Sequence, residues 1–309
     1  MSTNSPIRSE GQSNARLGRL LIGCPVWACE HWKGSLYRRK STRSEWLQDY
    51  SRVFSTVEGN STFYALPPAE TVKRWAESVS SEFRFSLKMP RILTHELRLV
   101  NATAELEKFL SLATILDDRR RLGPTFIQLP PDFSPRESDA LIRFLRALPT
   151  HLPWALEVRH HDWFDEGNIE LQLNQLLQEL NIDKVIFDSR PLFSKPPSDE
   201  IEAVSQKRKP KTPLRHTVTG NHPFLRLVGR NHLPDTQRWI DEWAPVIATW
   251  ISQGHDPYVF THAPDDRFAP EFARTLHRAV QRECPALPDL PFWPGEQEAT
   301  SSQRQQLLF

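Results

Sequence analysis

The sequence has few cysteines, no long apolar run and almost no net charge. Its three cysteines, Cys24, Cys29 and Cys284, form an odd and sparse set, which argues against a disulfide scaffold and has no zinc-ligand spacing. With 39 Lys and Arg against 38 Asp and Glu, the whole chain attracts neither nucleic acid nor a membrane, so such binding requires a local patch. No segment reaches membrane-span length, and residues 1–19 lack the apolar core of a secretory signal. We therefore expect a soluble, cytoplasmic and monomeric protein.

Motifs that would identify a cofactor or a nucleophile are also missing. The chain has no nucleophile motif, no phosphate-binding glycine loop and no dinucleotide fingerprint. His262, Asp265 and Asp266 resemble a metal cluster in part, but no second closely spaced ligand accompanies them. The sequence therefore predicts neither a cofactor nor a metal.

Aromatic residues are abundant, with 10 Trp and 17 Phe, so the body of the chain can bury a sizeable core. Apolar, β-branched or aromatic runs alternate with segments in which apolar residues recur at three- and four-residue intervals. Eight runs have the composition of strands: 19–24, 55–60, 83–89, 124–130, 154–159, 184–189, 223–229 and 257–262. This alternation predicts a parallel sheet covered by helices.

Eight strand–helix units over this length predict a closed (β/α)8 TIM barrel with eight parallel strands. An open doubly wound sheet is the alternative, although the usual glycine-rich turn after the first strand is absent. We expect the barrel to span residues 19–284, with flexible tails at 1–18 and 285–309. The proline-rich and basic stretch 190–222 predicts an insertion, with a short helix near 199–206.

Function in such barrels gathers at the C-terminal ends of the strands, and polar residues mark those ends here. Glu58 lies inside its strand and can face the interior. The other candidates at or just past strand ends are Trp27, Asn60, Thr62, Tyr64, Lys88, Thr94, His95, Gln128, Glu157, Arg159, His160, Trp163, Asp188, Arg226, Arg230 and His262. This mixture of cations, imidazoles and a few carboxylates predicts an anionic or phosphate-bearing ligand with proton transfer at hand.

Structural roles compete with this interpretation. Glu157 and Arg159 alternate with apolar neighbours, and such a pair can simply fill the barrel interior. Asn60 and Thr62 can cap a turn, and Gln128 can satisfy backbone groups. The basic run 206–216 can contact phosphates, although a solvated loop is the commoner explanation.

The ordered motifs "VEGNSTFYALP", "LGPTFIQLPPDF", "ALEVRHHDWF" and "FLRLVGR" resemble those of the YecE-like family, domain of unknown function 72. The resemblance spans about residues 20–280 and implies a TIM barrel whose motif residues meet at one end. It carries over no established reaction. Pro25, Val228 and Ala263 stand where the family usually has other residues, which leaves a binding barrel without catalysis open.

The chain ends in "QQLLF", which is similar to the short peptide with which bacterial proteins bind the DNA polymerase sliding clamp. Gln305, Leu308 and Phe309 would make that contact, whereas folding back onto the barrel or an accidental apolar end are the alternatives.

The leading hypothesis from the sequence is a barrel that binds a phosphate-containing ligand, foremost nucleic acid, and is tethered to the clamp. Glu157, Asp188, His95 and His160 are its catalytic candidates, and Lys88, Arg159 and Arg226 bind the anion. A hydrolase or phosphodiesterase-like activity would fit such a mouth. The alternatives are an enzyme acting on a small sugar-phosphate-like molecule and a catalytically silent binding barrel.

Overall fold

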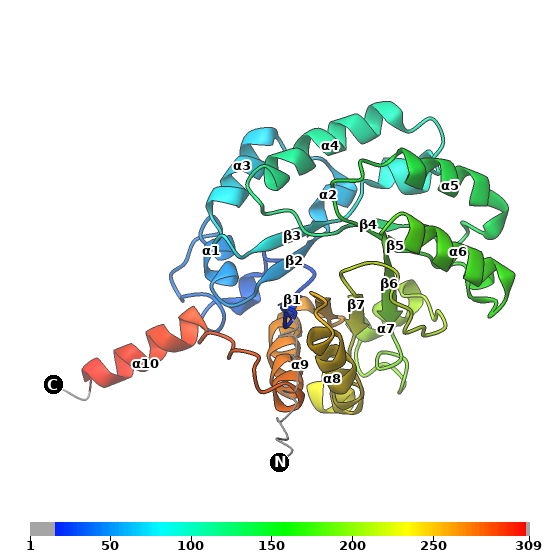
Figure 1. The fold of residues 1–309 in the computed structure, drawn as a ribbon. Helices are drawn as coiled ribbons and strands as arrows, with labels where there is room; N and C mark the ends of the chain where they lie inside the picture. The colour runs from blue at the N-terminus through cyan, green and yellow to red at the C-terminus, as the bar shows by residue number, and fades with distance from the viewer. Residues whose placement is uncertain (1–15, 307–309) are drawn as a thin grey trace, which may run out of the picture.

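The computed structural model describes residues 16–306, with side chains described through Ser301. Its strands are all parallel: β1 (Leu21–Gly23), β2 (Thr56–Gly59), β3 (Arg84–Leu87), β4 (Thr125–Gln128), β5 (Trp154–Glu157), β6 (Asp183–Asp188), β7 (Phe224–Val228) and β8 (Tyr258–His262). Seven fall within runs that the sequence predicts as strands, and β6 begins one residue before its predicted run 184–189. They curl around a common centre with most helices outside them (Figure 1).

The predicted closed eight-stranded barrel is wrong. Six strands form one curled sheet in the order β1-β8-β7-β6-β5-β4, and β2 and β3 form a separate two-stranded sheet. Between β3 and β4 only the isolated bridges Phe85–Leu122 and Lys88–Phe126 occur. Between β1 and β2, the Glu58 amide donates to the carbonyl of Cys24 at 3.1 Å.

The two gaps have different local causes. Pro124 stands directly before β4, and proline has no amide to donate to a ladder. Between β1 and β2 the Tyr50 hydroxyl takes the place of a direct backbone bond, because it accepts from the Cys24 amide at 2.7 Å and donates to the carbonyl of Thr56 at 3.0 Å. Side chains supply replacement hydrogen bonds at both gaps. Ser86 Oγ donates to the carbonyl of Pro124, and Ser55 Oγ accepts from the Ile22 amide. The parallel α/β arrangement thus persists without one continuous ladder.

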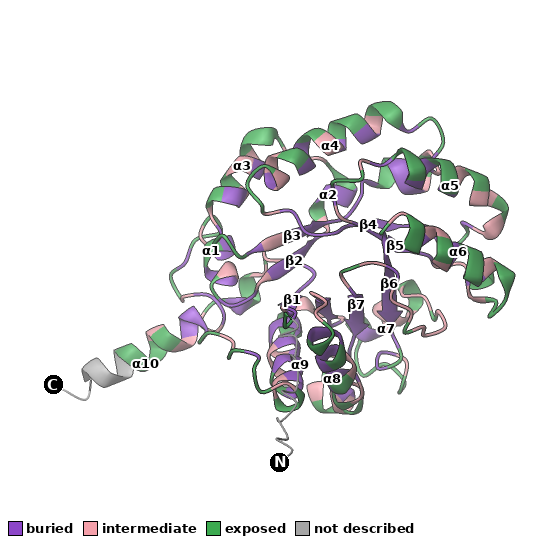
Figure 2. Ribbon diagram, in the orientation of Figure 1, coloured by how far each residue is buried: buried purple, intermediate pink, exposed green. Residues whose placement is uncertain are grey.

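Ten α-helices lie among residues 16–306: α1 (Trp46–Ser51), α2 (Ser61–Tyr64), α3 (Ala69–Glu77), α4 (Thr103–Asp117), α5 (Ser138–Ala147), α6 (Asn168–Glu179), α7 (Glu200–Arg208), α8 (Gln237–Ser252), α9 (Ala269–Glu283) and α10 (Pro294–Gln306). The longer outer helices α3 to α6, α8 and α9 bury one apolar face and expose the other (Figure 2). No helix among residues 16–306 is long and apolar enough to cross a membrane.

The interior of the curl is filled in layers. Aromatic side chains of three neighbouring or facing strands, Phe126, Phe224 and Phe260, pack together with the centroids of Phe126 and Phe224 at 5.7 Å. The guanidinium carbon of Arg226 lies 5.1 Å from the centre of the Phe126 ring. A charged layer therefore lies directly on the aromatic one.

The stretch 190–222 contains α7, close to the predicted short helix. Asp199 caps it by accepting from the Glu202 amide at 2.7 Å. Glu202 is fully buried and accepts from Arg230 at 2.6 Å and from the amide of Asn231 at 2.9 Å. These contacts hold α7 against the loop that follows β7.

The end of the chain is more ordered than the sequence predicts, because residues 294–306 form α10. Trp293 is buried, with the guanidinium carbon of Arg274 3.7 Å above its ring. Arg274 also pairs with Glu296 at 2.9 Å. The helix projects away from the other helices (Figure 1). Leu308 and Phe309 lie outside the described residues, as does the side chain of Gln305 and the segment 1–15.

Candidate functional site

A buried cluster of charges joins the two sheets. Arg226, from β7, donates Nε and Nη2 to the two carboxylate oxygens of Glu58, from β2, each at 2.8 Å. Its Nη1 donates to Glu157 at the end of β5. His262, from β8, lies 3.1 Å from Glu58, measured from Nε2 to Oε2. All four side chains are almost completely buried.

Both glutamates stay ionised in this cluster. Burial alone would raise the pKa of Glu157, but the charges of Arg226 and Arg159 outweigh it and lower the pKa to about 2. Burial would also raise the pKa of Glu58, but Arg226 and His262 outweigh it and hold that pKa well below its ordinary value. Glu157 also accepts from Gln128 at 2.9 Å and from Arg159 at 2.6 Å. With its lone pairs so occupied, Glu157 is better suited to holding cations than to accepting a proton.

Lys88 follows β3 and occupies a different environment. It is 8% exposed, its Nζ donates to Gln128 Oε1 at 2.7 Å, and its Nζ lies 3.8 Å from the centre of the Phe63 ring. No described carboxylate forms an ion pair with it. Burial, followed by the charges of Arg226 and Arg159, lowers the pKa of Lys88 to about 7.

Two histidines of the site are neutral at physiological pH. Burial lowers the pKa of His95 to about 4, with Lys88 and Arg159 contributing in the same direction. Thr94 Oγ1 lies 2.8 Å from His95 Nδ1, which orients the ring. Burial also lowers the pKa of His262 to about 4, against the opposing charge of Glu58.

Asn60 and Thr62 have the structural contacts expected of residues in a strand-to-helix turn. Asn60 Nδ2 donates to Glu58 Oε1 at 2.8 Å and to the carbonyl of Pro25 at 3.0 Å. Thr62 Oγ1 donates to the carbonyl of Lys88 at 2.7 Å. Together they fix the turn after β2 to the neighbouring loops.

A cavity of about 950 Å³ opens above this cluster, at the C-terminal ends of the strands. Eight of the residues singled out from the sequence line it: Asn60, Tyr64, Lys88, His95, Gln128, Arg159, Arg226 and His262. Glu58, Thr62, Thr94 and Glu157 lie buried beneath or beside it. Tyr64 is 81% exposed at its edge. The sequence therefore identifies most of one wall and the floor.

The opposite wall of the cavity is lined by residues that are not among the site residues predicted from the sequence. Helix α7 and its C-cap line it with Ile201, Val204, Arg208 and Lys209, and Asp266 contributes from the loop after β8. Arg208 and Lys209 belong to the basic run 206–216, whose composition allows phosphate contacts. Burial lowers the pKa of Lys209 to about 8 and raises the pKa of Asp266 to about 6.

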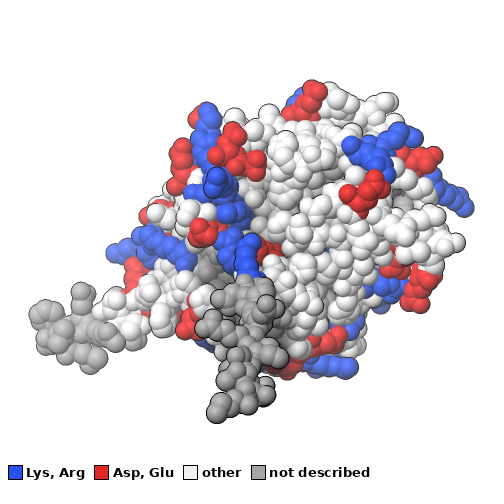
Figure 3. All heavy atoms as spheres, in the orientation of Figure 1, with Lys and Arg blue, Asp and Glu red and all other residues white. Residues whose placement is uncertain are grey.

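Cations outnumber carboxylates around this cavity. The six cations are Lys88, Arg91, Arg159, Arg208, Lys209 and Arg226, and the four carboxylates in or beneath it are Glu58, Glu157, Glu200 and Asp266. Neither Lys88 nor Lys209 forms an ion pair with a described residue. On the outer face in Figure 3, by contrast, acidic and basic groups lie side by side. The cavity thus has a local excess of cations over carboxylates.

Five predicted site residues face elsewhere. Asp188 binds Arg190 at 2.8 Å and accepts from Trp243 Nε1 at 2.8 Å. Arg230 is buried against Glu202. The other three, with their partners, are Trp27 against Trp75, His160 accepting from the Asp162 amide, and Trp163 donating to the carbonyl of Phe133. These side chains hold elements together and do not line the cavity.

His262 and Asp265, which resemble part of a metal cluster in the sequence, bind different partners in the structure. His262 points at Glu58, whereas Asp265 accepts from the Arg267 amide at 3.0 Å and from its Nε at 2.6 Å. Among the described residues, no group of three His, Cys, Asp or Glu side chains gathers in a way that could hold a metal ion.

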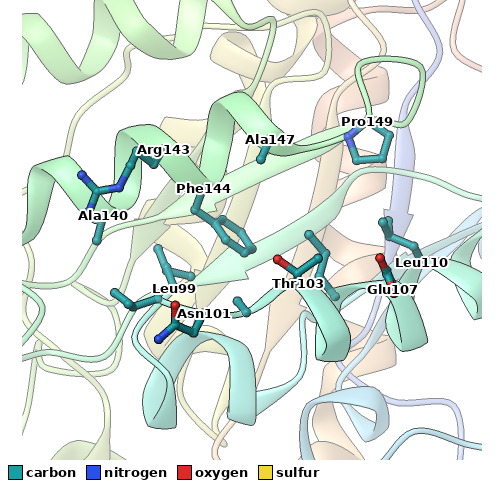
Figure 4. Close-up of a pocket in the computed structure, with 13 residues that line it drawn as sticks. Leu99, Asn101, Thr103, Glu107, Leu110, Ala140, Arg143, Phe144, Ala147 and Pro149 are labelled. Atoms are coloured by element: carbon teal, nitrogen blue, oxygen red, sulfur yellow. The ribbon is translucent and has the colours of Figure 1, made fainter.

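A second hollow, of about 590 Å³, lies on the outer surface between α4 and α5 (Figure 4). Its lining is mostly aliphatic, with Phe144 at its centre and Glu107 and Arg143 at its edges. It contains none of the residues predicted to bind a ligand.

Comparisons with known proteins agree with the resemblance noted in the sequence. The profile of the family described as "Protein of unknown function DUF72" matches residues 21–297. The UPF0759 protein YecE of Escherichia coli strain K12 is 34% identical over 277 residues, covering 90% of this chain and 98% of that protein. The UPF0759 protein YunF of Bacillus subtilis is 29% identical over 166 residues, covering 52% of this chain and 57% of that protein.

Two crystal structures of DUF72 family proteins share the fold. The one from Enterococcus faecalis has a TM-score of 0.62 at 20% identity and covers 86% of this chain and 97% of that one. The one from Thermotoga maritima has a TM-score of 0.61 at 21% identity and covers 85% and 99%. The profile match and the identity to YecE establish that the chain belongs to the DUF72 family.

Proposed function

We propose that this protein binds a small molecule bearing a phosphate or carboxylate in the cavity above Arg226. The observation that carries the proposal is the excess of positive charge there. Arg226 is neutralised by Glu58 and Glu157, whereas Lys88 and Lys209 face the cavity without a carboxylate partner. Cations desolvated in this way are stabilised by an anion placed between them.

The size of the cavity favours a small molecule over a nucleic-acid strand. Its volume of about 950 Å³ lies at the upper end of the range of roughly 300–1,000 Å³ typical of ligand pockets. Helix α7 closes one side with Ile201 and Val204, which offer apolar contact beside the cations. Nucleic-acid binding and a tether to the sliding clamp stay predictions from the sequence, since the terminal Leu308 and Phe309 lie outside the described residues.

Thermal unfolding with a panel of anions tests the proposal. We expect inorganic phosphate, pyrophosphate and glycerol phosphate to raise the Tm of the wild-type protein at constant ionic strength, because they bind only the folded state. Lys88→Met should lose at least half of this shift. Lys108→Met is the control, because Lys108 is an exposed residue of α4 paired with Glu105.

An equal phosphate shift in Lys88→Met and wild type would contradict the site. A single-stranded oligonucleotide provides the other arm of the experiment. If the oligonucleotide stabilises the protein and none of the small anions does, the small-molecule proposal fails in favour of the nucleic-acid alternative.

A further inference from the structure

The environment of the Lys88 amine differs from that of an ordinary structural lysine. Its nitrogen faces the cavity, is almost fully buried, and has one hydrogen-bond acceptor, the amide oxygen of Gln128, at 2.7 Å. The remaining contact is the face of the Phe63 ring at 3.8 Å. A lysine that only compensates charge would be expected beside a carboxylate, as Lys184 is beside Glu170 at 3.3 Å.

The carboxylates of the strands near Lys88 are paired with other residues. Glu157 lies on the neighbouring β5 but is bound by Arg159 and Arg226, and Glu58 on β2 is bound by Arg226 and His262. The Gln128 amide lies between the amine and Glu157, because it accepts from Lys88 Nζ at 2.7 Å and donates to Glu157 at 2.9 Å. On the η2 side, His95 (in Ile92–Glu96) is neutral.

From this geometry we propose that Lys88 is a nucleophilic amine that forms an imine with the carbonyl group of an anionic substrate, such as an oxo acid or a phosphorylated aldehyde or ketone. The proposal rests on the proposed function, because Arg159 and Lys209 would hold the anionic end of that substrate in the same cavity. It adds the reacting group of the ligand and a covalent role for one residue.

The chemistry balances without any additional reactant. The lone pair on Nζ attacks the carbonyl carbon, and the electrons of the C=O bond move to the oxygen. Both amine hydrogens then leave with that oxygen as water while the C=N bond forms. Once protonated, this imine withdraws electrons from the adjacent carbon, so the class of reaction it supports is cleavage or formation of a bond next to the original carbonyl.

The protonation state of Lys88 is compatible with this role. A nucleophilic amine has to be neutral, and a pKa of about 7 leaves a large neutral fraction at physiological pH, whereas an exposed lysine with a pKa near 10.4 has almost none. The ring of Phe63 and the oxygen of Gln128 also restrict the amine to one position, so that less ordering is needed at the moment of attack.

Pyridoxal 5′-phosphate is a suitable probe because it carries an aldehyde and a phosphate in one small molecule. The full-length protein is incubated with it, the imine is reduced with borohydride to a stable secondary amine, and the modified lysine is located by peptide mass spectrometry. We expect labelling of Lys88 at least about tenfold above the exposed lysines at pH 7.5, given its far larger neutral fraction. Lys88 should also exceed Lys209, whose pKa of about 8 leaves a smaller neutral fraction. Labelling should rise with pH around 7 and then level off.

Two probes test the anion site, and two variants test the assignment of the label to Lys88. Pyridoxal, which lacks the phosphate, should label Lys88 several-fold more slowly, and inorganic phosphate should protect it. Lys88→Met should lose this label, whereas Lys108→Met should retain it. Because labelling is mapped in the wild-type protein, the result does not depend on whether the variant folds.

The proposal is overturned if phosphate stabilises the protein and yet Lys88 is labelled no faster than the exposed lysines. In that case the anion site stands and the covalent role is lost. If phosphate neither stabilises the protein nor protects Lys88, the proposed function itself fails, and preferential labelling of Lys88 would then reflect a reactive amine without an anion site.

Discussion

At the scale of single residues, the side chain of Arg226 joins the two sheets. It connects β7 of the six-stranded sheet with β2 of the two-stranded sheet through Glu58, and it also binds Glu157. Since few backbone hydrogen bonds join the two sheets, this side chain replaces part of the missing ladder. The same residue lines the cavity, so the structure and the candidate site share it.

Removing Arg226 should therefore be costly. Arg226→Met leaves two buried carboxylates without their shared partner, and we expect a loss of about 3–5 kcal/mol in the free energy of unfolding. Chemical denaturation at pH 7 measures this loss. Arg146→Met is the control, because Arg146 forms an exposed pair with Glu179 across α5 and α6 and should change stability by less than about 1 kcal/mol. Similar losses in both variants would contradict the structural role of Arg226.

At the scale of secondary-structure elements, α10 shows what sequence patterns miss. Its residues 294–306 are mostly polar and have no apolar periodicity, so the sequence predicts a flexible tail. The helix is instead held at its first turn by Trp293 and Glu296, both of which contact Arg274 on α9. Gly295 fits there because a Cβ would lie 2.3 Å from the carbonyl oxygen of Tyr37. Contacts this distant in sequence are invisible to a local pattern.

Adjacent aromatic residues allow a matched test of this anchor. Trp293 is 5% exposed and Phe292 is 78% exposed. We expect Trp293→Ala to cost about 3 kcal/mol and to release α10 to rapid limited proteolysis, whereas Phe292→Ala should change stability by less than about 0.5 kcal/mol. If both variants show the same protease sensitivity as wild type, Trp293 does not anchor the helix.

The positions of all eight strands could be predicted from sequence, because buried parallel strands are short apolar or β-branched runs. The parallel pairing of neighbouring strands could also be predicted, but the breaks between β1 and β2 and between β3 and β4 could not. These breaks depend on Pro124, on the Tyr50 hydroxyl and on how much backbone the side chains of Ser55 and Ser86 satisfy. Lys88 and Arg226 could be predicted as site residues because they lie at strand ends. The position of Lys209 at the cavity could not be predicted, because it depends on how α7 packs against Arg230. Asp188, by contrast, ends β6 as expected, but its carboxylate accepts a hydrogen bond from Trp243 and does not line the cavity.

At the scale of the whole molecule, the buried glutamates link stability to acidity. The pKa of Glu157 is about 2 in the folded protein against an ordinary value of 4.5, so its contribution to stability is complete above about pH 4.5 and is lost as the pH falls toward 2. Glu58, with a pKa well below the ordinary value, acts in the same direction. Acid should therefore break the connection between the two sheets.

This dependence can be measured by urea denaturation between pH 5 and 2.5. Wild type should lose stability with falling pH, and Glu157→Gln should lose it less steeply, by up to about 1.4 kcal/mol per pH unit for the one missing proton. Glu77→Gln, an exposed substitution at the end of α3 without an ion pair among the described residues, should follow the wild-type slope. Identical slopes for Glu157→Gln and wild type would show that Glu157 is not held ionised by its arginines.

The anion site is tested most directly by a crystal structure of the wild-type protein with arsenate, whose arsenic atom is located by anomalous scattering. We expect an arsenic peak in the cavity above Arg226, with arsenate oxygens within hydrogen-bond distance of Lys88 and of Arg159 or Lys209. A cavity without arsenate, in crystals where the ion binds elsewhere on the surface, would contradict the claim that this is the anion site.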